Sequence, residues 1–113
     1  MKKANQRVFE GMYIFSAALS ENARKKALEK ITRDIENRGG EIHKIFDQGR
    51  KKLASVIRRH KEGVYFLLYF SVPPEAIKEM KQEYALNEDL LRYMVMRAES
   101  VPEKIEFKPL VQQ

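Results

Sequence analysis

The side chains that could do chemistry in this sequence are basic, and they are concentrated between residues 44 and 61. The 113-residue chain carries 22 Lys and Arg against 16 Asp and Glu, a formal net charge of +6. This stretch, which we call the basic window, has one acidic residue and seven basic ones, so its net charge equals that of the whole chain. The basic residues are Lys44, Arg50, Lys51, Lys52, Arg58, Arg59 and Lys61. Such a density of cationic groups favours a polyanionic partner, with nucleic acid first and an acidic protein or an anionic membrane surface as alternatives.

A second candidate is the aromatic stretch EGVYFLLYF, residues 62–70, because RNA-recognition motifs stack bases on aromatic residues of a central strand. The signature of that motif places a basic residue before a Gly and an aromatic residue after it. Around Gly63 these two positions hold Glu62 and Val64. The match to the RNA-recognition signature is therefore poor.

Strand alternation gives a further argument against base stacking by this stretch. Successive side chains of a strand point to opposite faces of the sheet. Phe66 and Phe70 therefore lie on one face, and Tyr65 and Tyr69 lie on the other. We expect this strand, and Phe66 in particular, to belong to the core.

The sequence offers no catalytic or metal-binding constellation. It has no Cys, which excludes disulfides and thiolate metal sites, and its two His residues are 17 positions apart. No Ser has a recognisable His and acid as partners. The segment SAALS after the first expected strand also lacks the Gly and Arg of a phosphate-cradling hydrolase loop. We therefore expect no enzyme activity, cofactor or small-molecule substrate.

The elements that would position the basic window begin with a strand over residues 8–15, rich in aromatic and branched residues. Ser20 suits a helix N-cap, and apolar residues at helical spacing follow it until Gly39-Gly40 ends the helix. Residues 41–58 are typical of a second strand with an irregularity at Gly49.

The second half of the chain repeats the alternation of strand and helix. A turn over residues 60–63 leads into the apolar stretch, which is the third expected strand. Pro74 suits the first turn of a second helix, which runs to about Ala85. Leu90 to Arg97 is typical of a fourth strand.

The order β-α-β-β-α-β predicts an α+β fold of the ferredoxin-like, split βαβ kind. Two helices would cover one face of a four-stranded antiparallel sheet, whose strands are ordered fourth, first, third and second along the chain. We expect one domain over residues 1–98 and a tail over residues 99–113. No apolar run approaches the roughly 20 residues that span a bilayer, and the basic N-terminus is a poor signal peptide, so we expect a cytoplasmic protein without a membrane partner.

Three blocks of the sequence resemble the family of the sixth protein of the bacterial small ribosomal subunit. GRKKLASVIRRHKEGVY, residues 49–65, is similar to the family's Gly-x-Arg/Lys-Arg/Lys-Leu-Ala segment and the Gly-aromatic pair that follows it. LNEDLLRYMVMR, residues 86–97, resembles the turn into its last strand, and FEGMYIF, residues 9–15, fits its first strand. Ser55, Gln48 and Val64 depart from the pattern, since many members have aromatic residues there.

The resemblance implies a ribosomal protein that binds the central domain of small-subunit ribosomal RNA together with the eighteenth protein of the same subunit. By position, Lys51, Lys52, Leu53 and Ala54 match the family's basic second strand, and Arg92 matches the basic residue that opens its last strand. The expected RNA-binding residues are Lys51, Lys52, Arg50, Arg58, Arg59, Lys61, Arg92, Arg97, Lys2, Lys3 and Arg7.

The second strand also carries more apolar side chains than one packed face can use. As an edge strand it would offer unpaired backbone groups to a second chain. The expected contacts with the partner protein are Ile42, Lys44, Phe46, Leu53 and Ser55. The alternative function is a ferredoxin-like interaction module that binds an acidic partner or self-associates through its sheet.

Overall fold

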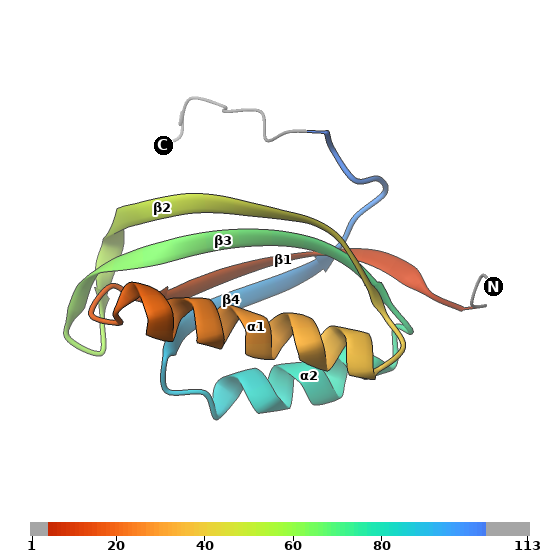
Figure 1. Cartoon of the computed structure of the whole chain (residues 1–113), viewed down its shortest axis with the longest axis horizontal. Coiled ribbons are helices and arrows are strands. Elements are labelled where there is room, and N and C mark those ends of the chain that lie inside the picture. The colour runs from red at the N-terminus through yellow and green to blue at the C-terminus, as the bar shows by residue number, and fades with distance from the viewer. Residues whose placement is uncertain (1–4, 104–113) are drawn as a thin grey trace.

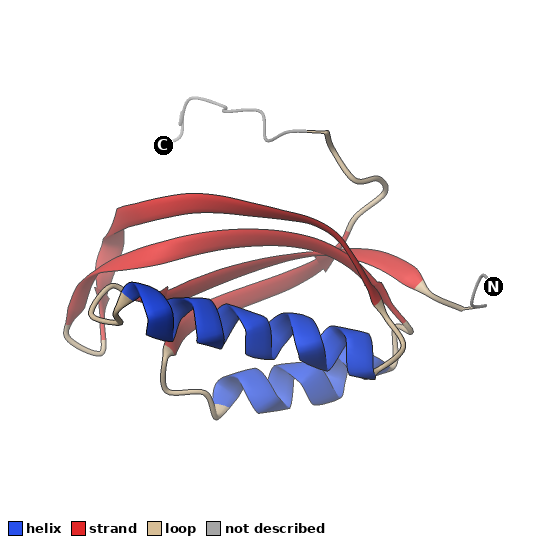
Figure 2. Ribbon diagram, in the orientation of Figure 1, coloured by secondary structure: helices blue, strands red, loops and turns tan. Residues whose placement is uncertain are grey.

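Four strands and two helices follow one another in the order that the sequence predicts. The computed structural model describes residues 5–103. Its elements are β1 (Arg7–Ser16), α1 (Glu21–Asn37), β2 (Glu41–Ile57), β3 (His60–Val72), α2 (Ala76–Ala85) and β4 (Leu90–Arg97). The strands pair antiparallel in the order β2-β3-β1-β4, and both helices lie on one face of the sheet (Figures 1 and 2). The predicted ferredoxin-like fold and strand order are confirmed.

The core lies between the helices and the sheet. Phe66 and Phe70 of β3 are 6% and 0% exposed, and they pack with residues of both helices. The ring of Phe66 meets the ring of Phe15 edge to face, with centroids 5.8 Å apart. Phe66 is therefore a core residue, as predicted. The opposite sheet face, which carries no helix, is called the open face below.

Helix α1 begins and ends where the sequence predicts. The hydroxyl of Ser20 accepts a hydrogen bond from the backbone N–H of Ala23 at 3.1 Å, which satisfies one of the unpaired amides of the first turn. At the other end Gly39 takes a left-handed φ of 82°, and the N–H of Gly40 bonds to the carbonyl of Ile35 at 2.9 Å.

Arg38 holds the two helices together at this end of α1. Its guanidinium bonds to Asp34 of the same helix and to Glu79 and Glu83 of α2. These hydrogen bonds, first the one to Glu79, raise the pKa of Arg38 above its usual value.

The predicted turn over residues 60–63 is wrong. β2 continues to Ile57, β3 begins at His60, and the two-residue turn between them consists of Arg58 and Arg59. Gly63 lies inside β3, where a Cβ atom would come within 2.5 Å of the side chain of Ile14. It is therefore a close-packing glycine and not a turn glycine.

The other two irregular positions are close to their expected places. Gly49 marks a shift of register in β2 with a φ of 79°, which confirms the predicted irregularity. The second helix starts at Ala76, two residues later than Pro74 suggests, because residues 74 and 75 form a turn closed by the Ala76 N–H and the Pro73 carbonyl.

A second, smaller apolar cluster lies on the open face at the β2–β3 hairpin. Leu53 of β2 packs with Ile14 of β1 and Leu91 of β4, although β2 and β4 are the two edge strands. The hairpin must therefore bend across the sheet, and Figure 1 shows β2 and β3 curving together at this end. This bend brings the hairpin end of the basic window toward β4.

The chain beyond β4 crosses back toward β2. The N–H of Ala98 bonds to the carbonyl of Val8, and the Nζ of Lys44 lies 3.5 Å from the carbonyl of Glu103. Val101 and Pro102 are half-buried. The boundary expected at residue 98 remains a prediction, and residues 104–113 of the expected tail lie outside the described part of the chain.

Candidate nucleic-acid interface

Strand alternation divides three consecutive cations of the basic window, residues 50–52, between the two sides of the sheet. Lys51 lies on the open face, with its Nζ 5.2 Å from the centroid of the Tyr65 ring, a cation–π contact. Arg50 and Lys52 lie on the helix side with Glu62, which is the cross-strand neighbour of Lys52. The three cations therefore line both sides of the edge strand β2.

Arg50 is held by contacts within the chain. Its guanidinium donates to the carboxylate of Glu62 and to the carbonyl of Ala17, both at 3.2 Å. The two charged side chains are about half exposed, at 60% and 49%, and exposed ion pairs of this kind contribute little to stability. Glu62 therefore holds the Arg50 guanidinium only weakly.

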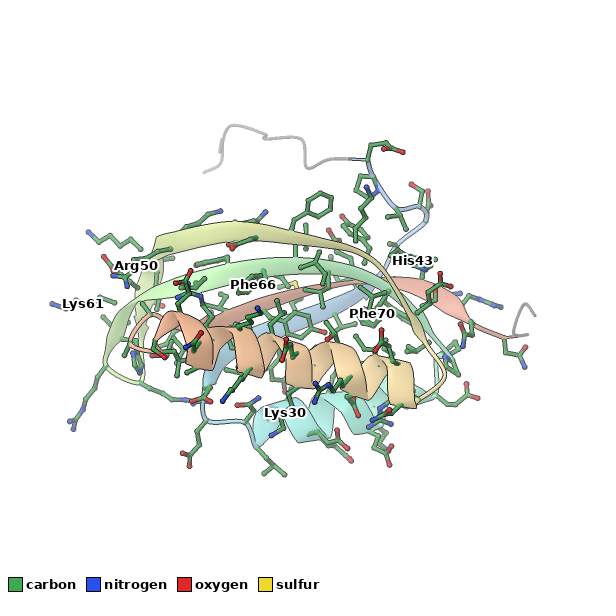
Figure 3. All side chains as sticks on the ribbon, viewed as in Figure 1. Lys30, His43, Arg50, Lys61, Phe66 and Phe70 are labelled. Carbon is green, nitrogen blue, oxygen red and sulfur yellow. The ribbon has the colours of Figure 1, made fainter. Side chains whose placement is uncertain are left out.

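The hairpin tip carries three exposed cations, Arg58, Arg59 and Lys61. Arg58 donates from Nη1 to the backbone carbonyl of Glu88 at 3.3 Å, which ties the tip to the turn between α2 and β4. Figure 3 shows Arg50 and Lys61 together at this end of the molecule. The hairpin thus concentrates positive charge at one end of the molecule.

Arg92 belongs to the same end of the sheet. It is exposed and pairs in register with Ile14, which packs against Leu53 of the hairpin. Sequence spacing alone, with some 30 residues between Arg59 and Arg92, does not reveal this proximity. It follows from the bend of the hairpin.

The remaining expected RNA-binding residues are elsewhere. Arg97 pairs with Phe9 and Arg7 pairs with Val72, so both lie at the far end of the sheet from the hairpin. Lys2 and Lys3 lie outside the described residues. The fold therefore brings together six of the predicted positions, which we call the hairpin cluster: Arg50, Lys51, Lys52, Arg58, Arg59 and Lys61, with Arg92 beside them.

The expected partner-binding residues are spread along β2, which is an edge strand as predicted. Phe46 is half-buried and meets the Tyr69 ring edge to face at 6.1 Å, whereas Ser55 is exposed. Ile42 packs against the core, and Lys44 contacts the Glu103 carbonyl. Leu53 is buried within the small cluster, with 8% of its surface exposed. β2 also exposes two apolar side chains, Ile45 and Val56, at 44% and 60%.

The open face also carries two methionines and a hydrogen-bonded tyrosine. Met94 and Met96 of β4 are about half exposed, and their i, i+2 spacing on a strand was the available signal. Tyr69 donates its hydroxyl hydrogen to the carboxylate of Glu10 at 2.7 Å. Burial and this hydrogen bond to a carboxylate raise the pKa of Tyr69 to about 12.

Other sites are less suited to a ligand. Within residues 5–103 no three His, Cys, Asp or Glu side chains gather as metal ligands, and no helix is long and apolar enough to span a membrane. His43 bonds to Ser71 at 2.6 Å, at the end of the sheet opposite Lys61 (Figure 3). A groove between α1 and α2 mixes Lys26, Lys30 and Arg33 with Glu29, Asp34 and Glu83, so it does not select a polyanion.

Comparison with known proteins agrees with this architecture. The family model described as ribosomal protein S6 matches residues 8–97. The small ribosomal subunit protein bS6 of Chlamydia pneumoniae is 61% identical over 109 residues, 96% of each chain. That of Chlamydia muridarum is 57% identical over 110 residues, covering 97% of this chain and 98% of the relative.

A solved structure extends the comparison to three dimensions. The crystal structure of 30S ribosomal protein S6 from Thermotoga maritima superposes with a TM-score of 0.77 at 28% identity, covering 82% of this chain and 88% of that one. The fold, the strand order and the matched residues lead to one conclusion. The chain belongs to the family of ribosomal protein S6, a structural and non-enzymatic protein of the small ribosomal subunit.

Proposed function

We propose that this chain binds the central domain of small-subunit ribosomal RNA through the hairpin cluster, in the cytoplasm and on the ribosome. The observation that carries the proposal is the concentration of the chain's excess charge in one window, six of whose seven cations lie in the hairpin cluster beside Arg92. Membership of a small-subunit protein family supports RNA as the polyanion.

In this proposal the chain binds and positions RNA and catalyses no reaction. Each cation that meets a phosphate releases condensed counterions, which favours binding and makes it depend on salt. Because Arg50 and Lys52 face one side of the sheet and Lys51 faces the other, the hairpin fits between RNA segments better than on a flat helix surface. Shape complementarity to a folded junction would then provide the selectivity.

The proposed protein partner is the eighteenth protein of the small subunit, docking along β2. The edge position of β2 and its exposed Ile45 and Val56 support a contact that combines strand pairing with apolar burial. In this proposal Phe46, Ser55 and the stem of Lys44 join the contact. Ile42 packs against the main core and Leu53 packs in the small cluster on the open face, so these two anchor the strand.

The RNA-binding proposal is tested by removing the charges of the hairpin. We expect the variant K51Q/K52Q/R58Q/R59Q to bind a central-domain RNA fragment more weakly. The slope of log affinity against log salt should flatten by up to about 0.7–0.9 for each phosphate that the variant no longer neutralises. The affinity is measured by filter binding or fluorescence anisotropy across a salt series.

The matched control is K25Q/K26Q/K30Q/R33Q, which removes the same charge from exposed positions of α1. We expect its salt slope to stay near that of the wild type. If both variants lose affinity equally, binding depends on net charge alone, and the hairpin is not the interface. Salt-insensitive self-association of the wild type, with no RNA binding, would favour the alternative of a protein-interaction module.

A further inference from the structure

The β2–β3 turn has an unusual backbone for its sequence. Arg58 and Arg59 both adopt the left-handed region, with φ of 48° and 72°, between the paired residues Ile57 and His60. Two-residue hairpin loops of this kind favour Asn-Gly or Asp-Gly, because a Cβ atom is strained at positive φ. The only other described non-Gly residue with positive φ is Asn5, a residue type that tolerates this conformation.

Contacts within the chain do not account for two arginines at this turn. Both side chains are exposed. Arg58 makes a single hydrogen bond, to the carbonyl of Glu88, and no described residue accepts a hydrogen bond from Arg59. Strain of this kind at an exposed position indicates a function for the side chains and not for the turn itself.

We infer that the strained Arg58–Arg59 turn is an arginine fork that grips neighbouring phosphates of a folded RNA strand. The inference rests on the proposed function and adds the residues and geometry that carry it. Both guanidinium groups belong to one two-residue turn, and the bond of Arg58 to Glu88 ties this turn to the one between α2 and β4 before RNA arrives. Such preorganisation lowers the entropic cost of binding, and guanidinium groups can hold phosphate oxygens in pairs.

The inference predicts opposite changes in stability and affinity for one variant. R58N/R59G supplies the residues that the turn prefers at two strained positions. This gain exceeds the loss of the single exposed hydrogen bond from Arg58 to Glu88, so the urea unfolding midpoint should rise above that of the wild type. The same variant should bind the central-domain RNA fragment about tenfold more weakly at 0.1 M salt, since two guanidinium groups that bond to phosphates are removed. K25Q/K26Q on α1 removes the same charge and should change the affinity less than about twofold, because exposed charges distant from the RNA are screened.

A second variant separates the fork from simple charge. R58K/R59K keeps the charge and the strain, so its unfolding midpoint should match the wild type. Its affinity should still fall, by about threefold, because an ammonium group cannot hold two phosphate oxygens in a planar fork.

Three results would overturn the inference while the wild type still binds RNA. They are an unchanged or lower midpoint for R58N/R59G, wild-type affinity for the same variant, and wild-type affinity for R58K/R59K. If the wild type itself binds no RNA, the proposed function fails, and the fork fails with it.

Discussion

Phe66 shows at the scale of one residue how burial decides the role of an aromatic side chain. Its ring is 6% exposed and meets Phe15 inside the main core, whereas Tyr65 on the other face lies under Lys51. We expect Phe66→Ala to lower the free energy of unfolding by about 3–5 kcal/mol, because it leaves a cavity among packed side chains. Urea denaturation measures this change.

Phe46→Ala is the control. Phe46 is half-buried at the sheet edge, so this substitution should lower the free energy of unfolding by less than Phe66→Ala does. Unchanged stability of Phe66→Ala together with weakened RNA binding would contradict the assignment. Base stacking contributes roughly 1–3 kcal/mol per base to binding with the fold intact, so that pattern would identify a stacking platform.

Glycines and turns mark the limit of prediction at this scale. The sequence correctly predicts the irregularity at Gly49 and the helix end at Gly39-Gly40. Gly39 and Gly49 both adopt a positive φ, and this preference of glycine can be recognised from the local sequence. It misplaces the hairpin turn because Gly63 serves a close approach to Ile14 of a distant strand. Arg58 and Arg59 carry no turn propensity, so no local signal indicates their left-handed conformation.

At the scale of elements, two tyrosines connect β1 to α2. The hydroxyls of Tyr13 and Tyr84 are hydrogen-bonded at 2.9 Å, and both rings are buried. Burial, more than any other cause, raises the pKa of Tyr84 to about 12, and it also raises the pKa of Tyr13. The folded state therefore holds these phenolic protons more tightly than the unfolded state, whose tyrosine pKa is about 10.

The stability from this pair is present below about pH 10 and is lost as the pH rises from about 10 toward 12. We expect Tyr84→Phe to reduce this alkaline loss, by on the order of 2 kcal/mol, because the titrating hydroxyl is gone. Urea unfolding at pH 8.5 and 11.5 measures the loss for both proteins. An equal alkaline loss in the two would show that Tyr84 does not titrate with folding.

The edge strand β2 gives a second prediction at this scale. If the eighteenth small-subunit protein docks there, amide hydrogen exchange over residues 41–58 should slow when that protein is added. The core strand β1 is the internal reference, because both of its sides are already paired, one with β3 and the other with β4. Protection that rises only on the helices or on β4 would contradict docking at the edge.

At the scale of the whole molecule, the sequence predicts the element order, the strand order and the core face, because these depend on periodicity and on general rules of connection. It also locates the excess charge. It does not predict that Arg92 joins the hairpin while Arg97 lies at the opposite end, since this depends on the bend that packs Leu53 on Ile14 and Leu91. Long-range packing of this kind leaves no local pattern.

The central claim is that the chain is a component of the small ribosomal subunit held by its RNA. Sedimentation of a cell lysate through a sucrose gradient, after a salt wash, tests it most directly. We expect the wild-type chain to sediment with small subunits and K51Q/K52Q/R58Q/R59Q to be released at lower salt. A wild-type chain that stays at the top of the gradient, while the other small-subunit proteins sediment with their RNA, would contradict the account.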